Sequence, residues 1–147
     1  MVIVDKSLDE LLLGIDSPKI VFNQFCYLGN PDSNHSSYFG FKDLRSSIAG
    51  VIMGLGGADY SRLIEEVLLN SAGHGNGWDS AKPLQVVIYS GLNGWLLNVT
   101  DSGEGFDYKK VISDGIFHNF GVGFEFYKAS KLRVSFDNNG RTINLLG

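Results

Sequence analysis

Three polar residues follow one another at intervals of four near the middle of the chain: Glu66, Asn70 and His74. On an α-helix residues four apart lie almost above one another, so a helix here would carry all three on one stripe. A carboxylate and an amide are costly to leave unpaired among apolar side chains. The stripe therefore either lines a pocket for a metal ion and an anionic ligand, or is the solvent side of an amphipathic helix.

A second carboxylate, Asp101, stands where a predicted strand ends and a glycine-rich loop begins. Gly103 and Gly105 permit backbone conformations that other residues resist, so a ligand can approach this loop closely. A carboxylate placed there can accept a hydrogen bond from the exocyclic amine of a base. The same pattern is also common in ordinary turns. It does not match a calcium loop, because glycine replaces the oxygen-bearing side chains needed at alternate positions.

Two further features lie towards the C-terminus. Gly121 and Gly123 immediately precede a predicted helix, where unpaired N–H groups and the positive end of the helix dipole favour phosphate. Thr142 opens the last predicted strand, and its hydroxyl can face either solvent or the floor of a pocket. Each feature alone also occurs in ordinary structure, so their meaning depends on their occurring together.

Apolar periodicity predicts the elements that must position these residues. Strands are expected at 20–28, 84–89, 95–101, 132–136 and 141–146, and helices at 7–14, 41–55, about 59–73 and 122–128. The last four strands form two hairpins, which make a sheet largely antiparallel. We therefore expect an α/β two-layer sandwich in one domain, with a mixed, mostly antiparallel sheet and helices on one face. Residues 1–34 form a helix and strand extension without an assigned role.

Composition narrows the classes of function. The 147 residues carry a net charge of −4, which argues against a broad nucleic-acid-binding surface. The single cysteine, Cys26, cannot form an internal disulfide. The first residues lack the features of a signal peptide and no long apolar run follows, so we expect no membrane association and a cytoplasmic location.

Taken together and in order, four segments resemble the ATP-binding motifs of the gyrase and histidine kinase-like ATPase superfamily (GHKL, the Bergerat fold). Residues 66–75 resemble the N box, 101–107 and 121–124 the two glycine boxes, and 140–142 the threonine strand. The spacing of the N box and the short lid are most similar to those of the anti-sigma-factor serine kinases. The resemblance covers roughly residues 40–147.

The resemblance implies ATP and Mg²⁺ as ligands. Asn70 would hold the Mg²⁺ that bridges the phosphates, and Asp101 would bind the adenine amine with support from Thr142. Gly103 and Gly105 would shape the base pocket. Gly121 and Gly123 would let backbone amides reach the phosphates. His74 would complete the N box, and Glu66 would be the general base.

For function, the resemblance implies a regulatory protein that phosphorylates or sequesters a partner, such as a sigma factor or an anti-anti-sigma factor, with homodimerisation possible. Kinases of this family often carry an arginine just before the second glycine box, whereas residues 118–120 here are His-Asn-Phe. ATP binding is therefore the firmer expectation. A nucleotide-gated binding module without phosphotransfer, and a detached histidine-kinase catalytic domain, are the alternatives.

Overall fold

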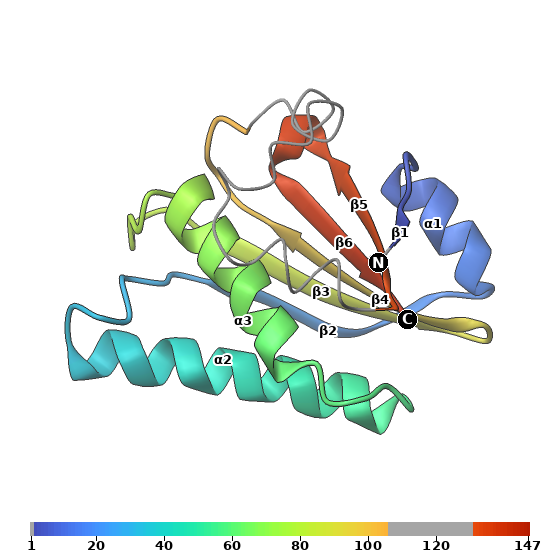
Figure 1. Ribbon diagram of the computed structural model, residues 1–147, viewed down its shortest axis with the longest axis horizontal. Helices are drawn as coiled ribbons and strands as arrows, with labels where there is room; N and C mark the ends of the chain where they lie inside the picture. Colours follow the sequence, from blue (N-terminus) through green and yellow to red (C-terminus); the bar gives the residue numbers. More distant parts are fainter. Residues whose placement is uncertain (1, 106–130) are drawn as a thin grey trace.

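The computed structural model describes residues 2–105 and 131–147, which build a six-stranded sheet and its covering helices (Figure 1). In chain order the elements are β1 (Val2–Ile3), α1 (Leu8–Ile15), β2 (Lys19–Cys26), α2 (His35–Gly54), α3 (Ser61–Leu69), a π-helical segment (Asn70–Gly75), β3 (Leu84–Gly91), β4 (Gly94–Thr100), β5 (Arg133–Asp137), a short 3₁₀ turn (Asn138–Gly140) and β6 (Thr142–Leu146). The helix predicted at 122–128 lies outside the described residues.

The sheet has the strand order β1-β5-β6-β4-β3-β2. Only β1 runs parallel to its neighbour, β5, and every other pair is antiparallel. The predicted α/β class and the mixed, mostly antiparallel sheet are thereby confirmed. The N-terminal segment without an assigned role supplies the strands at both edges, β1 on one side and β2 on the other.

The main core lies between one face of the sheet and the two long helices, α2 and α3 (Figure 1). Apolar side chains from both layers are fully buried there, among them Ile48, Ile52, Ile64, Leu68 and Leu97. This is the expected two-layer sandwich. The short α1 differs from the other helices, because Leu11 and Ile15 pack on Leu96 and Leu146 at a corner of the opposite face.

Local capping explains where two of the helices begin. The Ser7 hydroxyl accepts a hydrogen bond from the Glu10 N–H at 3.3 Å and so caps α1, which matches the helix expected at 7–14. α2 begins six residues earlier than predicted, because Asn34 caps it by accepting from the Ser37 N–H at 2.8 Å. Residues 35–40 are mostly exposed, so they show no apolar periodicity.

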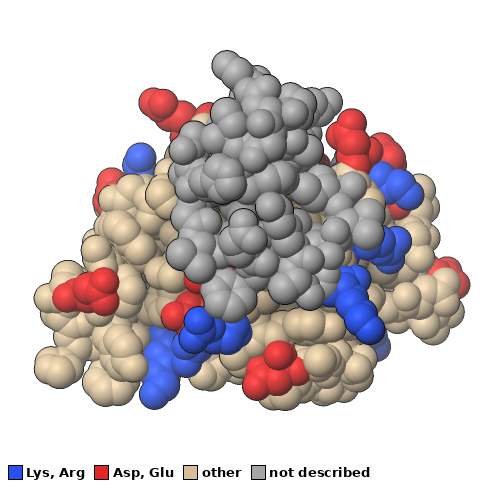
Figure 2. All heavy atoms as spheres, in the orientation of Figure 1, with Lys and Arg blue, Asp and Glu red and all other residues tan. Residues whose placement is uncertain are grey.

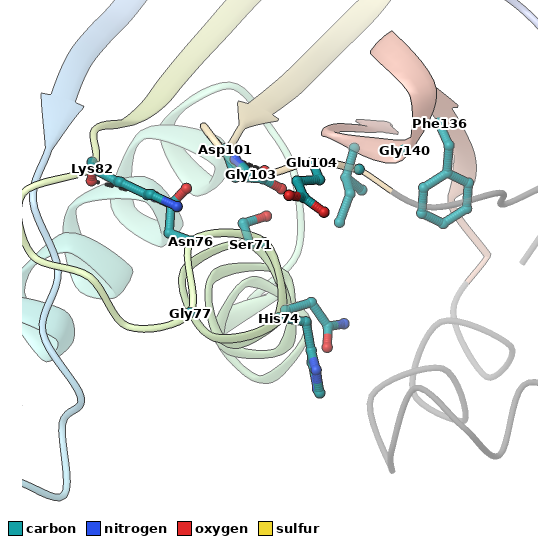
Figure 3. A pocket seen from close by; sticks show the side chains of 14 residues that line it. Ser71, His74, Asn76, Gly77, Lys82, Asp101, Gly103, Glu104, Phe136 and Gly140 are labelled. Carbon is teal, nitrogen blue, oxygen red and sulfur yellow. Dashed lines mark hydrogen bonds between the residues drawn. The ribbon is translucent and has the colours of Figure 1, made fainter.

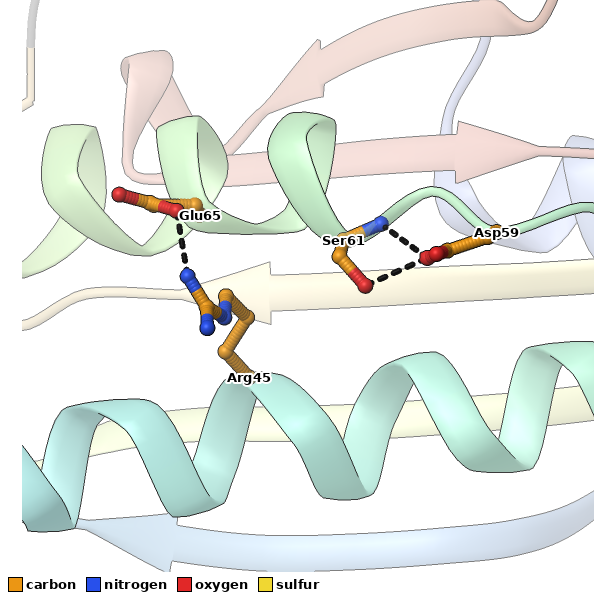
Figure 4. A network of polar contacts seen from close by, with 4 residues as sticks. All are labelled: Arg45, Asp59, Ser61 and Glu65. Atoms are coloured by element: carbon orange, nitrogen blue, oxygen red, sulfur yellow. Dashed lines mark hydrogen bonds and ion pairs between the residues drawn. The ribbon is translucent and has the colours of Figure 1, made fainter.

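Polar contacts fix how α3 begins and how it lies against α2 (Figure 4). The Asp59 carboxylate accepts hydrogen bonds from both the N–H and the hydroxyl of Ser61, which stabilises the first turn. Arg45 on α2 forms an ion pair with Glu65 on α3 at 2.6 Å. These contacts anchor the start of the helix that carries the polar stripe.

Lys, Arg, Asp and Glu side chains are interspersed over the described part of the surface in Figure 2, as a small net charge leads one to expect. Over the described residues, no helix combines the length and the apolar character needed to cross a membrane.

Candidate functional site

A cavity of about 470 Å³ opens where three distant segments of the chain meet (Figure 3). One wall is the π-helical segment at the end of α3 with the turn after it. The second wall is the glycine-rich loop after β4, and the third comes from β5, β6 and the turn between them. The cavity thus brings Asn70 and His74 of the polar stripe together with the glycine-rich loop after β4.

Asp101 is the buried charged group of this cavity, with only 8% of its surface exposed. Its Oδ1 accepts a hydrogen bond from the Gly103 N–H at 2.8 Å, and its own N–H donates to the Arg141 carbonyl at 2.9 Å. Burial raises the pKa of the Asp101 carboxyl, and the Gly103 hydrogen bond and the charges of Arg141 and Lys82 oppose that rise. Within the described residues Oδ2 accepts no hydrogen bond, so the carboxylate retains acceptor capacity.

Three glycines allow the walls of the cavity to approach closely. A Cβ on Gly75 would collide with the Asp101 side chain, and one on Gly103 would collide with the Gly75 carbonyl. A Cβ on Gly105 would collide with the carbonyl of Asn139 in the turn between β5 and β6. Larger residues at these positions would force the segments apart, so the glycines are required by the assembly of the site.

Asn76 ties the same segments together with its side chain, which is 4% exposed. Its Oδ1 accepts from the Ser102 N–H at 2.7 Å, and its Nδ2 donates to the carbonyls of Lys82 and Pro83 at 3.3 and 3.2 Å. The Ser102 hydroxyl donates to the Pro83 carbonyl at 2.7 Å. The glycine-rich loop is therefore held to the end of the helix by side-chain and backbone bonds.

The helix that carries the polar stripe widens at the cavity. Beyond Leu69 the regular α-helix becomes π-helical, and the Asn76 N–H bonds to the Ser71 carbonyl five residues earlier at 2.9 Å. Such π-helical turns are rare and frequently occur at functional sites. Asn70 and His74 both line the cavity, and the widened turn adds Ser71 to its wall.

Glu66 lies one helical turn before Asn70, is half-buried, and is not among the described residues that line the cavity. Its pKa is raised, chiefly by burial and then by the neighbouring Glu65 carboxylate, while Arg62 opposes the rise. Proximity to the cavity and a raised pKa both suit a proton acceptor.

Thr142 does not line the cavity formed by the described residues. Its hydroxyl is buried on the other face of the sheet, where it pairs with the Thr100 hydroxyl at 2.9 Å and accepts from Asn138 Nδ2 at 2.9 Å. Among the described residues the Thr142 hydroxyl makes no direct hydrogen bond to Asp101, whose N–H donates to the neighbouring Arg141 carbonyl. Gly121 and Gly123 lie outside the described residues.

Sequence reasoning missed several residues of the cavity. Phe136 and Ile143 form an apolar part of its wall, and Ser71, Asn76 and Lys82 form polar parts. The signal for Ile143 was present, because strand alternation places Ile143 and Leu145 on the core face and therefore Thr142 on the other. No local signal identifies Ser71 or Asn76, since their roles depend on contacts between distant segments.

Asn70 supplies a side-chain oxygen of the kind that Mg²⁺ binds. In residues 2–105 and 131–147, no three or more His, Cys, Asp and Glu side chains cluster as a metal site. Mg²⁺ in nucleotide sites keeps several waters and is usually held by one or two carboxylates together with the phosphates. Asn70 offers an amide oxygen in this position, so the phosphates and water would supply the rest of the shell.

Comparison of the chain with protein-family models, with curated proteins and with solved structures finds no match. The functional argument therefore depends on the motifs and on the geometry of the cavity.

Proposed function

We propose that the protein binds an adenine nucleotide with Mg²⁺ in this cavity. The observation that carries the proposal is Asp101, a buried carboxylate on the cavity wall with acceptor capacity left over. A buried carboxylate is costly unless a donor compensates it, and the exocyclic amine of adenine is such a donor. The four motifs in their order support the same ligand.

The rest of the wall suits the other parts of a nucleotide. Phe136 and Ile143 offer an apolar surface for the face of a purine ring. Asn70 would hold Mg²⁺, which neutralises charge on the phosphate oxygens, and Lys82 adds positive charge to the wall. The close glycine contacts leave Asp101 little freedom to move, so its acceptor is positioned before the ligand arrives.

Calorimetric titration with ATP, in the presence and absence of Mg²⁺, tests the proposal. Asp101→Asn should weaken ATP binding at least tenfold, because an amide presents only one acceptor and Gly103 already uses it. Asn70→Ala should reduce the gain in affinity that Mg²⁺ provides. Asp43→Asn on the exposed surface of α2 is the matched control. Unchanged ATP affinity in Asp101→Asn would refute the assignment of this cavity.

We further propose that the bound nucleotide serves a regulatory protein kinase resembling the anti-sigma-factor serine kinases, with a sigma factor or an anti-anti-sigma factor as partner. The γ-phosphoryl group would pass from ATP to a serine hydroxyl of the partner, leaving ADP. Glu66 would accept the hydroxyl proton, and its position one helical turn before Asn70 supports that role, since Asn70 would hold the Mg²⁺ on the phosphates. A cytoplasmic location suits this role.

Transfer of labelled γ-phosphate to proteins that co-purify with the chain tests this second step. Glu66→Gln should retain ATP binding and lose transfer, while Glu65→Gln, whose carboxylate pairs with Arg45, should retain both. Acid-stable label indicates phosphoserine, and acid-labile label would instead favour the detached histidine-kinase catalytic domain. ATP binding without any transfer would identify the protein as a nucleotide-gated binding module.

A further inference from the structure

Ser71 carries an unpartnered buried hydroxyl in the wall of the cavity. The residue is 2% exposed, and its Oγ is the one buried side-chain N or O without a hydrogen bond among the described residues. Leaving such a group unpaired destabilises the folded protein, and native proteins rarely do so without a reason. An alanine would fit the same helix without that cost, so the unpaired hydroxyl is a candidate contact for a bound ligand.

The backbone around Ser71 does not use this hydroxyl. A serine within a helix often donates to the carbonyl four residues before it, but Ser71 does not. Its carbonyl instead accepts the Asn76 N–H in the widened turn. Figure 3 shows the hydroxyl directed from the helix towards the loop that carries Asp101 and Glu104.

Ser71 and Asp101 therefore present two different hydrogen-bonding groups to one cavity. Asp101 has a carboxyl oxygen still available to accept a hydrogen bond, whereas Ser71 can donate one. The Watson–Crick edge of adenine has the complementary order, with the amine as donor beside the N1 acceptor. Guanine presents an acceptor and then a donor, which this pair of groups would oppose.

We propose that Ser71 is a base-reading residue whose hydroxyl donates to N1 of adenine, directly or through one water, while Asp101 accepts from the amine. This inference rests on the proposed nucleotide site and adds a second specificity determinant to it. For Ser71→Ala we expect weaker binding of adenine nucleotides. We also expect the free variant to be no less stable than the parent, because the substitution removes an unpaired buried hydroxyl.

The test compares ATP with two analogues in calorimetric titrations. 1-Deaza-ATP lacks N1, and purine riboside triphosphate lacks the amine. Ser71→Ala should weaken ATP binding roughly three- to tenfold, which corresponds to one neutral hydrogen bond. The same variant should leave 1-deaza-ATP binding unchanged and weaken purine riboside triphosphate as much as ATP. Ser47→Ala, on an exposed position of α2, is the matched control.

Three outcomes would overturn the inference. Wild-type ATP affinity in Ser71→Ala would show that the hydroxyl makes no contact with the base. An equal loss for ATP and 1-deaza-ATP, or a lower melting temperature of the free variant, would show a structural role instead. If the unaltered protein bound neither ATP nor either analogue, the proposed nucleotide site would fail as well. That result differs from the others, because they are seen in the Ser71→Ala variant and leave binding by the unaltered protein intact.

Discussion

Replacing Gly75 by alanine tests whether close backbone approach builds the site. Gly75 closes the π-helical segment, and its φ is not among the positive values in the described residues, so alanine is compatible with the local backbone. The added Cβ would lie 2.8 Å from the Asp101 Cβ and nearer still to the carboxyl group. Side-chain carbons essentially never approach closer than 3.0 Å. The Asp101 side chain must therefore rotate or the two segments must separate.

The cost follows from the contacts that this movement disturbs. Overpacking a well-packed site costs about 1–3 kcal/mol. Rotation of Asp101 also breaks the 2.8 Å hydrogen bond from the Gly103 N–H, which adds about 1 kcal/mol. We expect Gly75→Ala to lose about 2–4 kcal/mol of the free energy of unfolding, part of the 5–15 kcal/mol typical of a domain. The variant should still fold.

Urea denaturation measures that loss, and ATP titration of the folded variant should show at least tenfold weaker binding because Asp101 is displaced. Gly50→Ala is the matched control, since Gly50 lies within α2 and a Cβ there meets nothing within 4 Å. That substitution should be neutral or stabilise the helix by up to about 1 kcal/mol. A Gly75→Ala protein as stable as the parent, with the same ATP affinity, would refute the packing argument.

Three further predictions concern neighbouring interactions. Asp101→Asn should stabilise the free protein at neutral pH. Because burial raises the pKa of Asp101 in the folded state, the contribution of this carboxyl to stability is greatest in acid and is lost as pH rises through that pKa. Urea denaturation should therefore show that the stability advantage of the variant shrinks towards about pH 4. Asn76→Ala should lower the free energy of unfolding by about 1–3 kcal/mol, and hydrogen exchange should show faster opening at the Ser102 N–H, which loses its acceptor. Arg45→Met should cost about 1 kcal/mol or less, and added salt should reduce the difference from the parent, because the ion pair with Glu65 is partly exposed.

The features that the sequence predicted correctly depend on residues that lie close together along the chain. The cap of α1 depends on Ser7 and Glu10, which lie three residues apart. The hairpin of β3 and β4 follows from two apolar runs joined at Gly91 and Gly94. Where short-range information is weak, the predictions were incomplete. β1 is only two residues long, and the first turn of α2 is too exposed to show periodicity.

The candidate site was predicted only in part, because much of it depends on which strands become neighbours. Asn70, His74 and Asp101, three of the residues singled out from the sequence, line one cavity. The sequence left the side that Thr142 faces open, and in the described residues its hydroxyl does not line the cavity, whereas the neighbouring Ile143 does. The π-helical widening adds Ser71 to the cavity wall. The four-residue spacing of the polar stripe predicts a regular α-helix and does not indicate this widening.

The sheet order explains why residues so far apart in sequence form one site. β6 lies between β4 and β5, so the loop after β4 and the turn between β5 and β6 open at the same end of the sheet. The Asp101 N–H bonds to the Arg141 carbonyl there, and Gly105 packs on the same turn. Binding at Asp101 would therefore involve both the π-helical segment after α3 and the hairpin of β5 and β6. A regulatory role would further require that a nucleotide bind one conformation of these segments more tightly than another.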